Sequence, residues 1–250
     1  MQVGFTWHEL FAPQPEAAVA FLAGVCGGAV ARAPLETPGG GPFLLLIQER
    51  RPVLGVMQPP RPGSPSWWDG YVAVPDLDAA LERASALGAR VVFDAPMAAE
   101  GWGRFSFLID PQGAGLGVIQ PSANAAIGGP NPGVGWQELA VDDPEAALAF
   151  YGALFDWREV GRLERPAGPC LLLGYGSERT GRLTVVRRSE GEAAGWRYYL
   201  HVGRLDPALA AAQERGATIA TGPRRVPGGG FAAVGVDPQG VDFALHAPRR

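Results

Sequence analysis

Residues 136–155 read WQELAVDDPEAALAFYGALF, and residues 7–26 read WHELFAPQPEAAVAFLAGVC. In the later stretch, Asp143 is a good helix N-cap and Pro144 suits the first helical position. The apolar residues that follow recur at helical spacing, which predicts a helix directly after a short strand. Because the earlier stretch repeats the pattern, a strand-then-helix unit is expected at both places.

The remainder of each half repeats in the same order. LDAALERASALGA from Leu77 matches LDPALAAAQERGA from Leu205, and the turn sequence Asp-Pro-Gln-Gly occurs at both Asp110 and Asp237. Alternating strand patterns and Gly-rich turns follow each predicted helix. The expected unit is therefore βαβββ, present four times, which gives an α+β fold.

A segment rich in Pro, Gly and Asn separates the two halves. Such a composition, with little apolar periodicity, is typical of a linker. We therefore predict a first domain over residues 1–121, a linker over residues 122–133 and a second domain over residues 134–250.

Composition removes several classes of function. The chain has 250 residues and a net charge of −4. Its basic residues are scattered along the sequence, which argues against a nucleic acid partner. All of them are Arg, so the chain has no lysine for a Schiff base or for a phosphate-binding loop. The N-terminus does not resemble a signal peptide, and the apolar runs are too short to span a bilayer. We expect a cytoplasmic protein without membrane contact, either monomeric as an internal pseudo-dimer or homodimeric.

The repeated motifs resemble those of the vicinal oxygen chelate superfamily, which includes glyoxalase I, bleomycin-resistance proteins and extradiol dioxygenases. The resemblance implies two glyoxalase-like domains, each with an incomplete barrel around a small-molecule cavity. Many members hold a divalent metal there with His, Glu or Gln. The motifs that carry the resemblance are WxELxxxDPEAAxAFY at 136–151, Trp68-xx-Tyr71, Trp196-xx-Tyr199, and Gly103-Arg-Phe followed by Asp110-Pro-Gln-Gly-Ala.

The pair His8-Glu9 suggests a metal site, but strand alternation points these side chains to opposite faces. At the positions where the resemblance places metal ligands, the first half has Trp7, Asp69 and Gly117, and the second has Trp136, Arg197 and Ala244. Only Asp69 could bind a cation, whereas a catalytic zinc site normally needs three protein ligands. We therefore expect no metal and no other cofactor, with a metal-dependent lyase or dioxygenase as the alternative.

Alternation also selects the side chains that would face the cavities. A carboxylate beneath an indole is poorly solvated and suited to proton transfer or to hydrogen bonding a ligand, although an ion pair with Arg is the structural alternative. The second half carries more ionisable groups and is the better candidate for an anionic ligand. The candidate catalytic residues are Glu138, Glu9 and His201; the candidate ligand-binding residues are Trp7, Trp136, Asp69, Tyr71, Arg197, Tyr199 and His246.

Aromatic walls with a few polar groups suit a small organic ligand. The sequence therefore predicts a protein that binds a small aromatic or polyketide-like molecule, either passively or with metal-free acid–base catalysis. A drug-sequestering role of the bleomycin-resistance type is a further alternative, and the identity of the molecule lies beyond the sequence.

Overall fold

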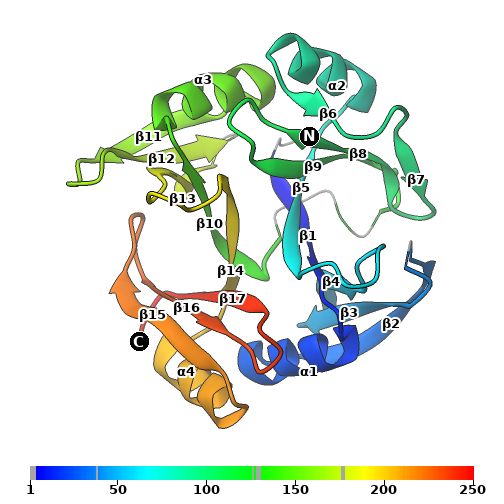
Figure 1. Cartoon of the computed structure of the whole chain (residues 1–250), viewed down its shortest axis with the longest axis vertical. Helices are drawn as coiled ribbons and strands as arrows, with labels where there is room; N and C mark the ends of the chain where they lie inside the picture. Colours follow the sequence, from blue (N-terminus) through cyan, green and yellow to red (C-terminus); the bar gives the residue numbers. More distant parts are fainter. Residues whose placement is uncertain (1–3, 38, 126, 128–130, 176–177) are drawn as a thin grey trace. The chain divides into compact units, whose positions relative to one another are not determined.

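The computed structural model of the chain describes residues 4–37, 39–125, 127, 131–175 and 178–250. Its elements form four consecutive modules, each a strand, a helix and further strands, which confirms the predicted α+β class (Figure 1). The second module carries one more short strand, β7 (Met97–Ala99), than the predicted βαβββ unit. The first two modules comprise β1 (Phe5–Phe11), α1 (Pro15–Cys26), β2 (Ala29–Glu36), β3 (Pro42–Gln48) and β4 (Arg51–Met57), then β5 (Trp67–Ala73), α2 (Leu77–Ala86), β6 (Arg90–Val91), β7 (Met97–Ala99), β8 (Gly103–Ile109) and β9 (Gly115–Pro121). The last two comprise β10 (Val134–Val141), α3 (Pro144–Phe155), β11 (Arg158–Leu163), β12 (Cys170–Tyr175) and β13 (Glu178–Arg187), then β14 (Gly195–His201), α4 (Leu205–Glu214), β15 (Thr218–Arg225), β16 (Phe231–Val236) and β17 (Asp242–Ala247).

The helix that the opening motif predicts begins where expected. The Asp143 carboxylate accepts hydrogen bonds from the backbone N–H groups of Glu145 at 3.0 Å and Ala146 at 3.1 Å. It thereby satisfies donors that the first turn of α3 would leave without partners, and Pro144 follows it in the chain. In α1 the equivalent residue is Gln14, whose side chain makes no capping bond.

Two Asp-Pro-Gln-Gly turns connect the antiparallel strands β8 and β9 and the antiparallel strands β16 and β17. Asp110 Oδ1 accepts from the backbone N–H of Gln112 at 2.9 Å and of Ala114 at 2.8 Å. Asp237 Oδ1 makes the same two bonds to the residues two and four further along. The repeated sequence therefore folds into the same side-chain-stabilised turn in both halves.

The strand order in the first half is β2-β3-β4-β1-β5-β9-β8-β6, with β7 paired to β8, and in the second half β11-β12-β13-β10-β14-β17-β16-β15. The opening strand of each module runs parallel to the last strand of that module, as in β1 with β4 and β14 with β17. Each helix packs on the later strands of its own module. We call the opposite face of a module's strands its helix-free face.

Contacts within the chain define two compact units that do not coincide with the two halves. The first unit consists of the residues up to Trp7 with Gly70–Asn131 and Gln137–Arg197, and α2 packs against α3 within it. The second consists of His8–Asp69, Pro132–Trp136 and Tyr198–Arg250, and α1 packs against α4 within it. The domain boundaries at residues 121 and 134 remain a prediction, and residues 126 and 128–130 of the predicted linker lie outside the described residues.

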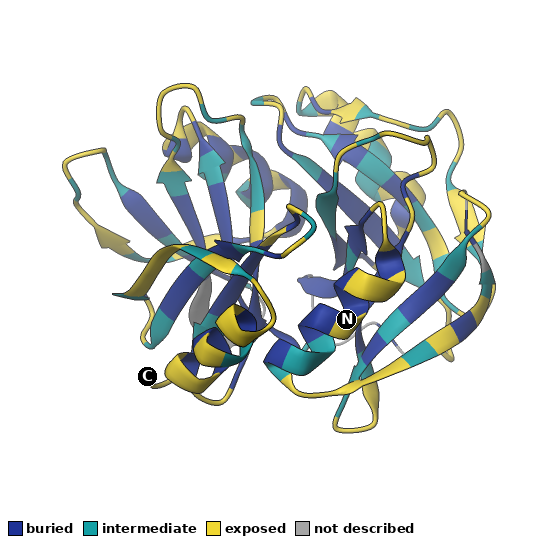
Figure 2. Cartoon of the chain, turned by 60° about the horizontal axis from the view of Figure 1, so that its bottom comes forward, coloured by how far each residue is buried: buried dark blue, intermediate teal, exposed yellow. Residues whose placement is uncertain are grey.

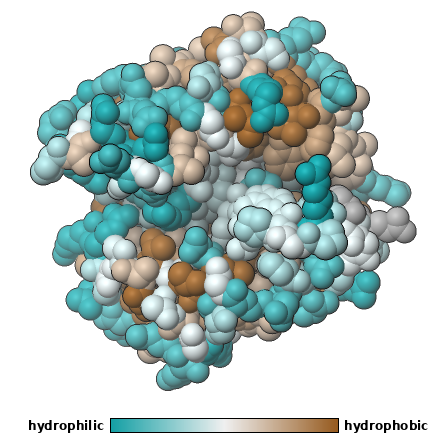
Figure 3. Space-filling model, in the orientation of Figure 1, coloured by the Kyte–Doolittle hydropathy of each residue, from teal (hydrophilic) through white to brown (hydrophobic). Residues whose placement is uncertain are grey.

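Burial follows the strand and helix patterns. Dark blue residues run along the strands, and yellow ones mark loops and the outer sides of helices (Figure 2). Hydrophilic side chains predominate on the face drawn in Figure 3, where apolar side chains form separate patches. Within the described ranges, every helix is too short or too polar to cross a bilayer.

Candidate functional site

The helix-free face of the fourth module can be located from contacts on the opposite side. Phe243 in β17 contacts Phe21 of α1, with ring centroids 5.2 Å apart, so it faces the helices. Because side chains alternate along a strand, the neighbouring Ala244 and His246 lie on the helix-free face. Tyr199 pairs with Ala244, and His201 pairs with His246 in the parallel β14–β17 ladder, so both residues share this face.

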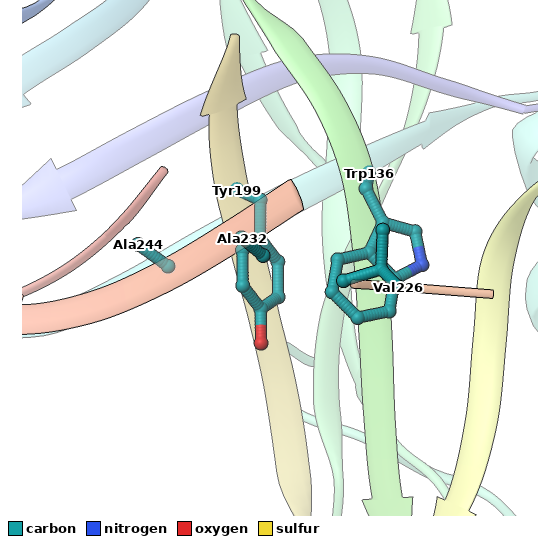
Figure 4. Close-up of a cluster of buried hydrophobic side chains, with 5 residues drawn as sticks. All are labelled: Trp136, Tyr199, Val226, Ala232 and Ala244. Carbon is teal, nitrogen blue, oxygen red and sulfur yellow. The ribbon is translucent and has the colours of Figure 1, made fainter. Parts of the chain in front are cut away.

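Trp136, on the neighbouring strand β10, packs against Tyr199 on this face. Their ring centroids are 4.3 Å apart and their planes are inclined by 34°. Figure 4 shows the two rings side by side, with the buried side chains of Val226, Ala232 and Ala244 around them. Trp136 is 2% exposed and Tyr199 0% exposed, so these rings belong to a packed apolar cluster rather than to an open surface.

Arg224 adds a positive charge to the cluster. Its Nη2 donates to the Tyr199 hydroxyl at 3.1 Å, and its Cζ lies 5.5 Å from the centroid of the Trp136 ring. Sequence reasoning missed this residue because β15 has irregular register at Thr221 and again before Arg224. Each irregularity changes the simple alternation of side chains, so counting along the strand could not assign Arg224 to a face.

His201 and His246 lie beside this cluster in the same unit. Their ring centroids are 6.3 Å apart, and His246 Nε2 is 3.1 Å from the carbonyl oxygen of Gly229. A Cβ atom on Gly135 would lie 2.8 Å from His246 Nδ1 and 3.1 Å from His201 Nδ1. The glycine at position 135 therefore permits both imidazoles to approach the β10 backbone.

Glu138 makes an ion pair in the first unit. Its Oε1 lies 3.6 Å from Arg197 Nη1, and Arg197 Nη2 lies 3.5 Å from Glu192 Oε1. The Glu138 side chain is 9% exposed, whereas that of Arg197 is 44% exposed. This geometry matches the salt-bridge alternative for Glu138, in which the carboxylate joins the third module to the first strand of the fourth.

Asp69 lies beside an aromatic stack in the second unit. The Phe11 and Trp67 rings are nearly parallel, with centroids 4.3 Å apart and planes inclined by 10°. Trp67 Nε1 donates to Asp69 Oδ2 at 2.9 Å. Burial raises the pKa of the Asp69 carboxyl to about 6, and the bond from Trp67 opposes that rise. Glu9, which pairs with Gly55, is partly exposed and shares the face of Phe11 by alternation.

Trp7 and Tyr71 lie in aromatic clusters of the first unit. The Trp7 ring is 4.7 Å from that of Trp102, in an edge-to-face arrangement. Tyr71 packs edge-on against Phe107 at 5.2 Å and Phe105 at 5.9 Å between centroids. Both phenylalanine rings are partly exposed. These contacts place two predicted ligand-binding residues among aromatic side chains, with Trp7 and Tyr71 themselves buried.

His8 takes no part in these faces. It is 0% exposed, and its ring packs edge-on against Tyr198 with centroids 4.7 Å apart. Burial lowers the pKa of its imidazole to about 3, so the ring is neutral at physiological pH. The histidine of the opening WHEL sequence is thus a core residue, on the side of β1 opposite to Glu9.

Family models match both halves of the chain. Residues 7–119 match the model of a glyoxalase-like domain, and residues 133–245 match that of the glyoxalase/bleomycin resistance protein/dioxygenase superfamily. The chain belongs to this superfamily. The resemblance inferred from the repeated motifs is thereby confirmed, and the chain is a tandem member of the vicinal oxygen chelate group.

Two relatives share a comparable level of sequence identity with this superfamily member. The CFP32 protein of Mycobacterium bovis, provisionally named a glyoxylase, is 29% identical over 252 residues, which cover 97% of this chain and 94% of CFP32. The anthracycline biosynthesis protein DauV of Streptomyces sp. strain C5 is 29% identical over 163 residues, which cover 59% of this chain and 58% of DauV.

Solved structures share the fold at much lower identity. The 2,2',3-trihydroxybiphenyl 1,2-dioxygenase of Sphingomonas wittichii RW1 has a TM-score of 0.69 at 16% identity, covering 98% of this chain and 90% of the dioxygenase. The Mn(II)-bound glyoxalase of Novosphingobium aromaticivorans has a TM-score of 0.68 at 15% identity, covering 99% of this chain and 82% of the glyoxalase. At these identities the likeness shows the fold alone.

A divalent metal needs side-chain donors, and the six positions that the sequence resemblance assigns to metal ligands supply few. Indole, guanidinium, methyl and glycyl groups do not ligate such ions, so Asp69 is the single donor among the six residues named above as ligand equivalents. Across the described part of the chain, His, Cys, Asp and Glu do not gather in threes or more as a metal site requires. The donor chemistry of these residues does not fit a catalytic metal.

Proposed function

We propose that this protein binds a small planar organic molecule, of the aromatic or polyketide-like kind, at the face that β1 and β5 share, where Phe11 stacks on Trp67 beside Asp69, and that binding requires no metal. The observation that carries the proposal is the Asp69 carboxyl beside the Phe11–Trp67 stack. Asp69 and Trp67 are both partly exposed, whereas Trp136 and Tyr199 in the second half are buried in their own cluster. For this reason we favour the first half, although the second half carries more ionisable groups.

The chemistry of this face suits a ring system with hydroxyl or carbonyl groups. Trp67 is partly exposed and offers a flat apolar surface, while the buried Phe11 ring is stacked on it, and aromatic rings gain from stacked or edge-to-face contact. A carboxyl with a pKa of about 6 is present in both protonation states near neutral pH. Asp69 can therefore accept a hydrogen bond from a phenol when ionised and donate one to a ketone when protonated.

Any acid–base catalysis at this face would use Asp69 as the proton carrier, with Glu9 as the second carboxyl in the same unit. A general acid or base works best when its pKa is near the working pH, and the Asp69 carboxyl meets that condition. Glu138 is a weaker choice because it is engaged by Arg197. His201 remains a candidate only if the molecule binds in the second half.

The name of one relative supports this class of molecule. DauV is an anthracycline biosynthesis protein, and anthracyclines are planar, hydroxylated aromatic polyketides. CFP32 is named a glyoxylase, which would imply a much smaller substrate. The partly exposed Trp67 ring beside Asp69 favours the polyketide-like molecule, because a planar ring system can cover the exposed part of the indole more fully than a small aldehyde adduct.

Titration with a tetracyclic hydroxyquinone, monitored by quenching of tryptophan fluorescence, tests the proposal. The wild-type protein, dialysed against a chelator, should bind saturably, and Asp69→Asn should weaken binding about tenfold, as expected for loss of one hydrogen bond to a charged group. Asp78→Asn is the matched control, because Asp78 is an exposed carboxylate paired with Arg104. Binding that appears only after Mn²⁺, Fe²⁺, Ni²⁺ or Zn²⁺ is added, or that Asp69→Asn leaves intact, would overturn the proposal.

A further inference from the structure

The second half carries a group that the proposed function does not use. The indole Nε1 of Trp136 is buried and has no hydrogen-bond partner among the residues that the structure describes. Indole nitrogen is solely a donor, and a buried donor without an acceptor is unfavourable in a folded protein. In Figure 4 this nitrogen lies on the edge of the ring that points away from Tyr199.

A fixed positive charge lies over the same ring. The guanidinium of Arg224 is 5.5 Å from the Trp136 centroid and is oriented by its bond to the Tyr199 hydroxyl. Arginine keeps its charge at every physiological pH, and its planar fork matches groups with two oxygen atoms. Arg224 is partly exposed, so the charge is accessible from the helix-free face.

We propose that Trp136 Nε1 and Arg224 form a second binding site, specific for an anionic group with two oxygens, such as an aromatic carboxylate. One oxygen would accept from the indole N–H and the other would face the guanidinium.

The segment that follows Val226 is short and rich in glycine. Val226 packs on the Trp136 cluster, and Gly228, Gly229 and Gly230 follow it with φ of 82°, 101° and 87°. Such angles are costly for other residues, so the turn is built from glycine for its backbone shape. Val226 is thus one of the buried side chains that pack with the indole.

The test uses 2-naphthoate and its uncharged analogue 2-naphthamide, with the full chain labelled with ¹⁵N at tryptophan. The Trp136 Nε1–H resonance is assigned by its loss in Trp136→Phe. Naphthoate should shift this resonance saturably and naphthamide should not. Arg224→Gln should weaken naphthoate binding about tenfold or more, because it removes a hydrogen bond to a charged group.

Arg225→Gln is the matched control. Arg225 is the next residue, exposed, with its Cζ 4.9 Å from the Phe231 ring centroid, and its loss should leave naphthoate binding unchanged. Asp69→Asn should also leave naphthoate binding unchanged, so the experiment tests this site separately from the site at Asp69. Equal shifts with naphthoate and naphthamide, or equal losses in Arg224→Gln and Arg225→Gln, would overturn the proposal. The comparison of the two probes on wild-type protein decides the matter even if Arg224→Gln does not fold.

Discussion

Trp136 and Tyr199 pack against each other in the second half, with their ring centroids 4.3 Å apart and their planes inclined by 34°. Both rings are buried, and small alanines at positions 232 and 244 make room for them. The two rings and the alanines therefore form a packed cluster in the second half.

Removal of the Trp136 indole should destabilise the folded protein. Trp136→Ala is expected to lower the free energy of unfolding by about 3–5 kcal/mol, because it leaves a cavity beside Tyr199 that alanines cannot fill. Urea denaturation measures this change. Leu163→Ala is the control, since Leu163 is 45% exposed and its truncation should change stability by less than about 0.5 kcal/mol. Equal effects from the two substitutions would contradict a packed cluster.

The β10 backbone beside the histidines should tolerate no side chain. Gly135→Ala would place a methyl group 2.8 Å from His246 Nδ1 and 3.1 Å from His201 Nδ1, closer than ordinary van der Waals contact. We expect destabilisation of about 1–3 kcal/mol, as for other overpacked sites. Gly195→Ala is the control because nothing lies within 4 Å of its added Cβ. Thermal unfolding of both variants should separate them, and a stable Gly135→Ala protein would disprove the close approach.

Much of the fold could be predicted from local sequence patterns, most of which occur in both halves of the chain. Asp143 and Pro144 start a helix for reasons that depend only on their neighbours, and Asp110 and Asp237 build turns from their own backbone. Strand alternation was equally local, and it correctly separated His8 from Glu9. The α+β class and the four modules follow from these rules together.

The parts that escaped prediction depend on register and on exposure. Arg224 reaches Tyr199 only because β15 is irregular, and bulges are not visible in the alternation of side chains. The stack of Phe11 on Trp67 joins residues far apart in the sequence, so it requires the sheet to be formed first. Which half has accessible rings depends on how closely side chains pack, and a sequence does not reveal that directly.

Glu138 should act through stability rather than through ligand contact. Glu138→Gln removes the charge that faces Arg197 and should lower the free energy of unfolding by about 1–3 kcal/mol, because the carboxylate is nearly buried. Glu192→Gln is the matched control on the same guanidinium; its side chain is 40% exposed, and its loss should cost less than about 1 kcal/mol. Naphthoate and hydroxyquinone affinities should be unchanged in both variants. A large loss of either affinity in Glu138→Gln would restore Glu138 as a ligand-binding residue.

The Asp69 carboxyl should make stability depend on pH in the direction opposite to a salt-bridged carboxylate. Burial raises its pKa from 3.8 to about 6, so between these values the folded protein holds a proton that the unfolded chain has released. Stability should therefore fall as pH rises through this window, by about 1–3 kcal/mol in total. Below the window both states are protonated and the penalty is absent, whereas above it the penalty is complete. The measurement is the difference in unfolding free energy between wild type and Asp69→Asn across this range, with Asp78→Asn as the control. A difference that stays flat with pH, or that grows in favour of the wild type as pH rises, would show that Asp69 ionises as an ordinary solvated carboxyl and would remove the basis for its proposed role in proton transfer.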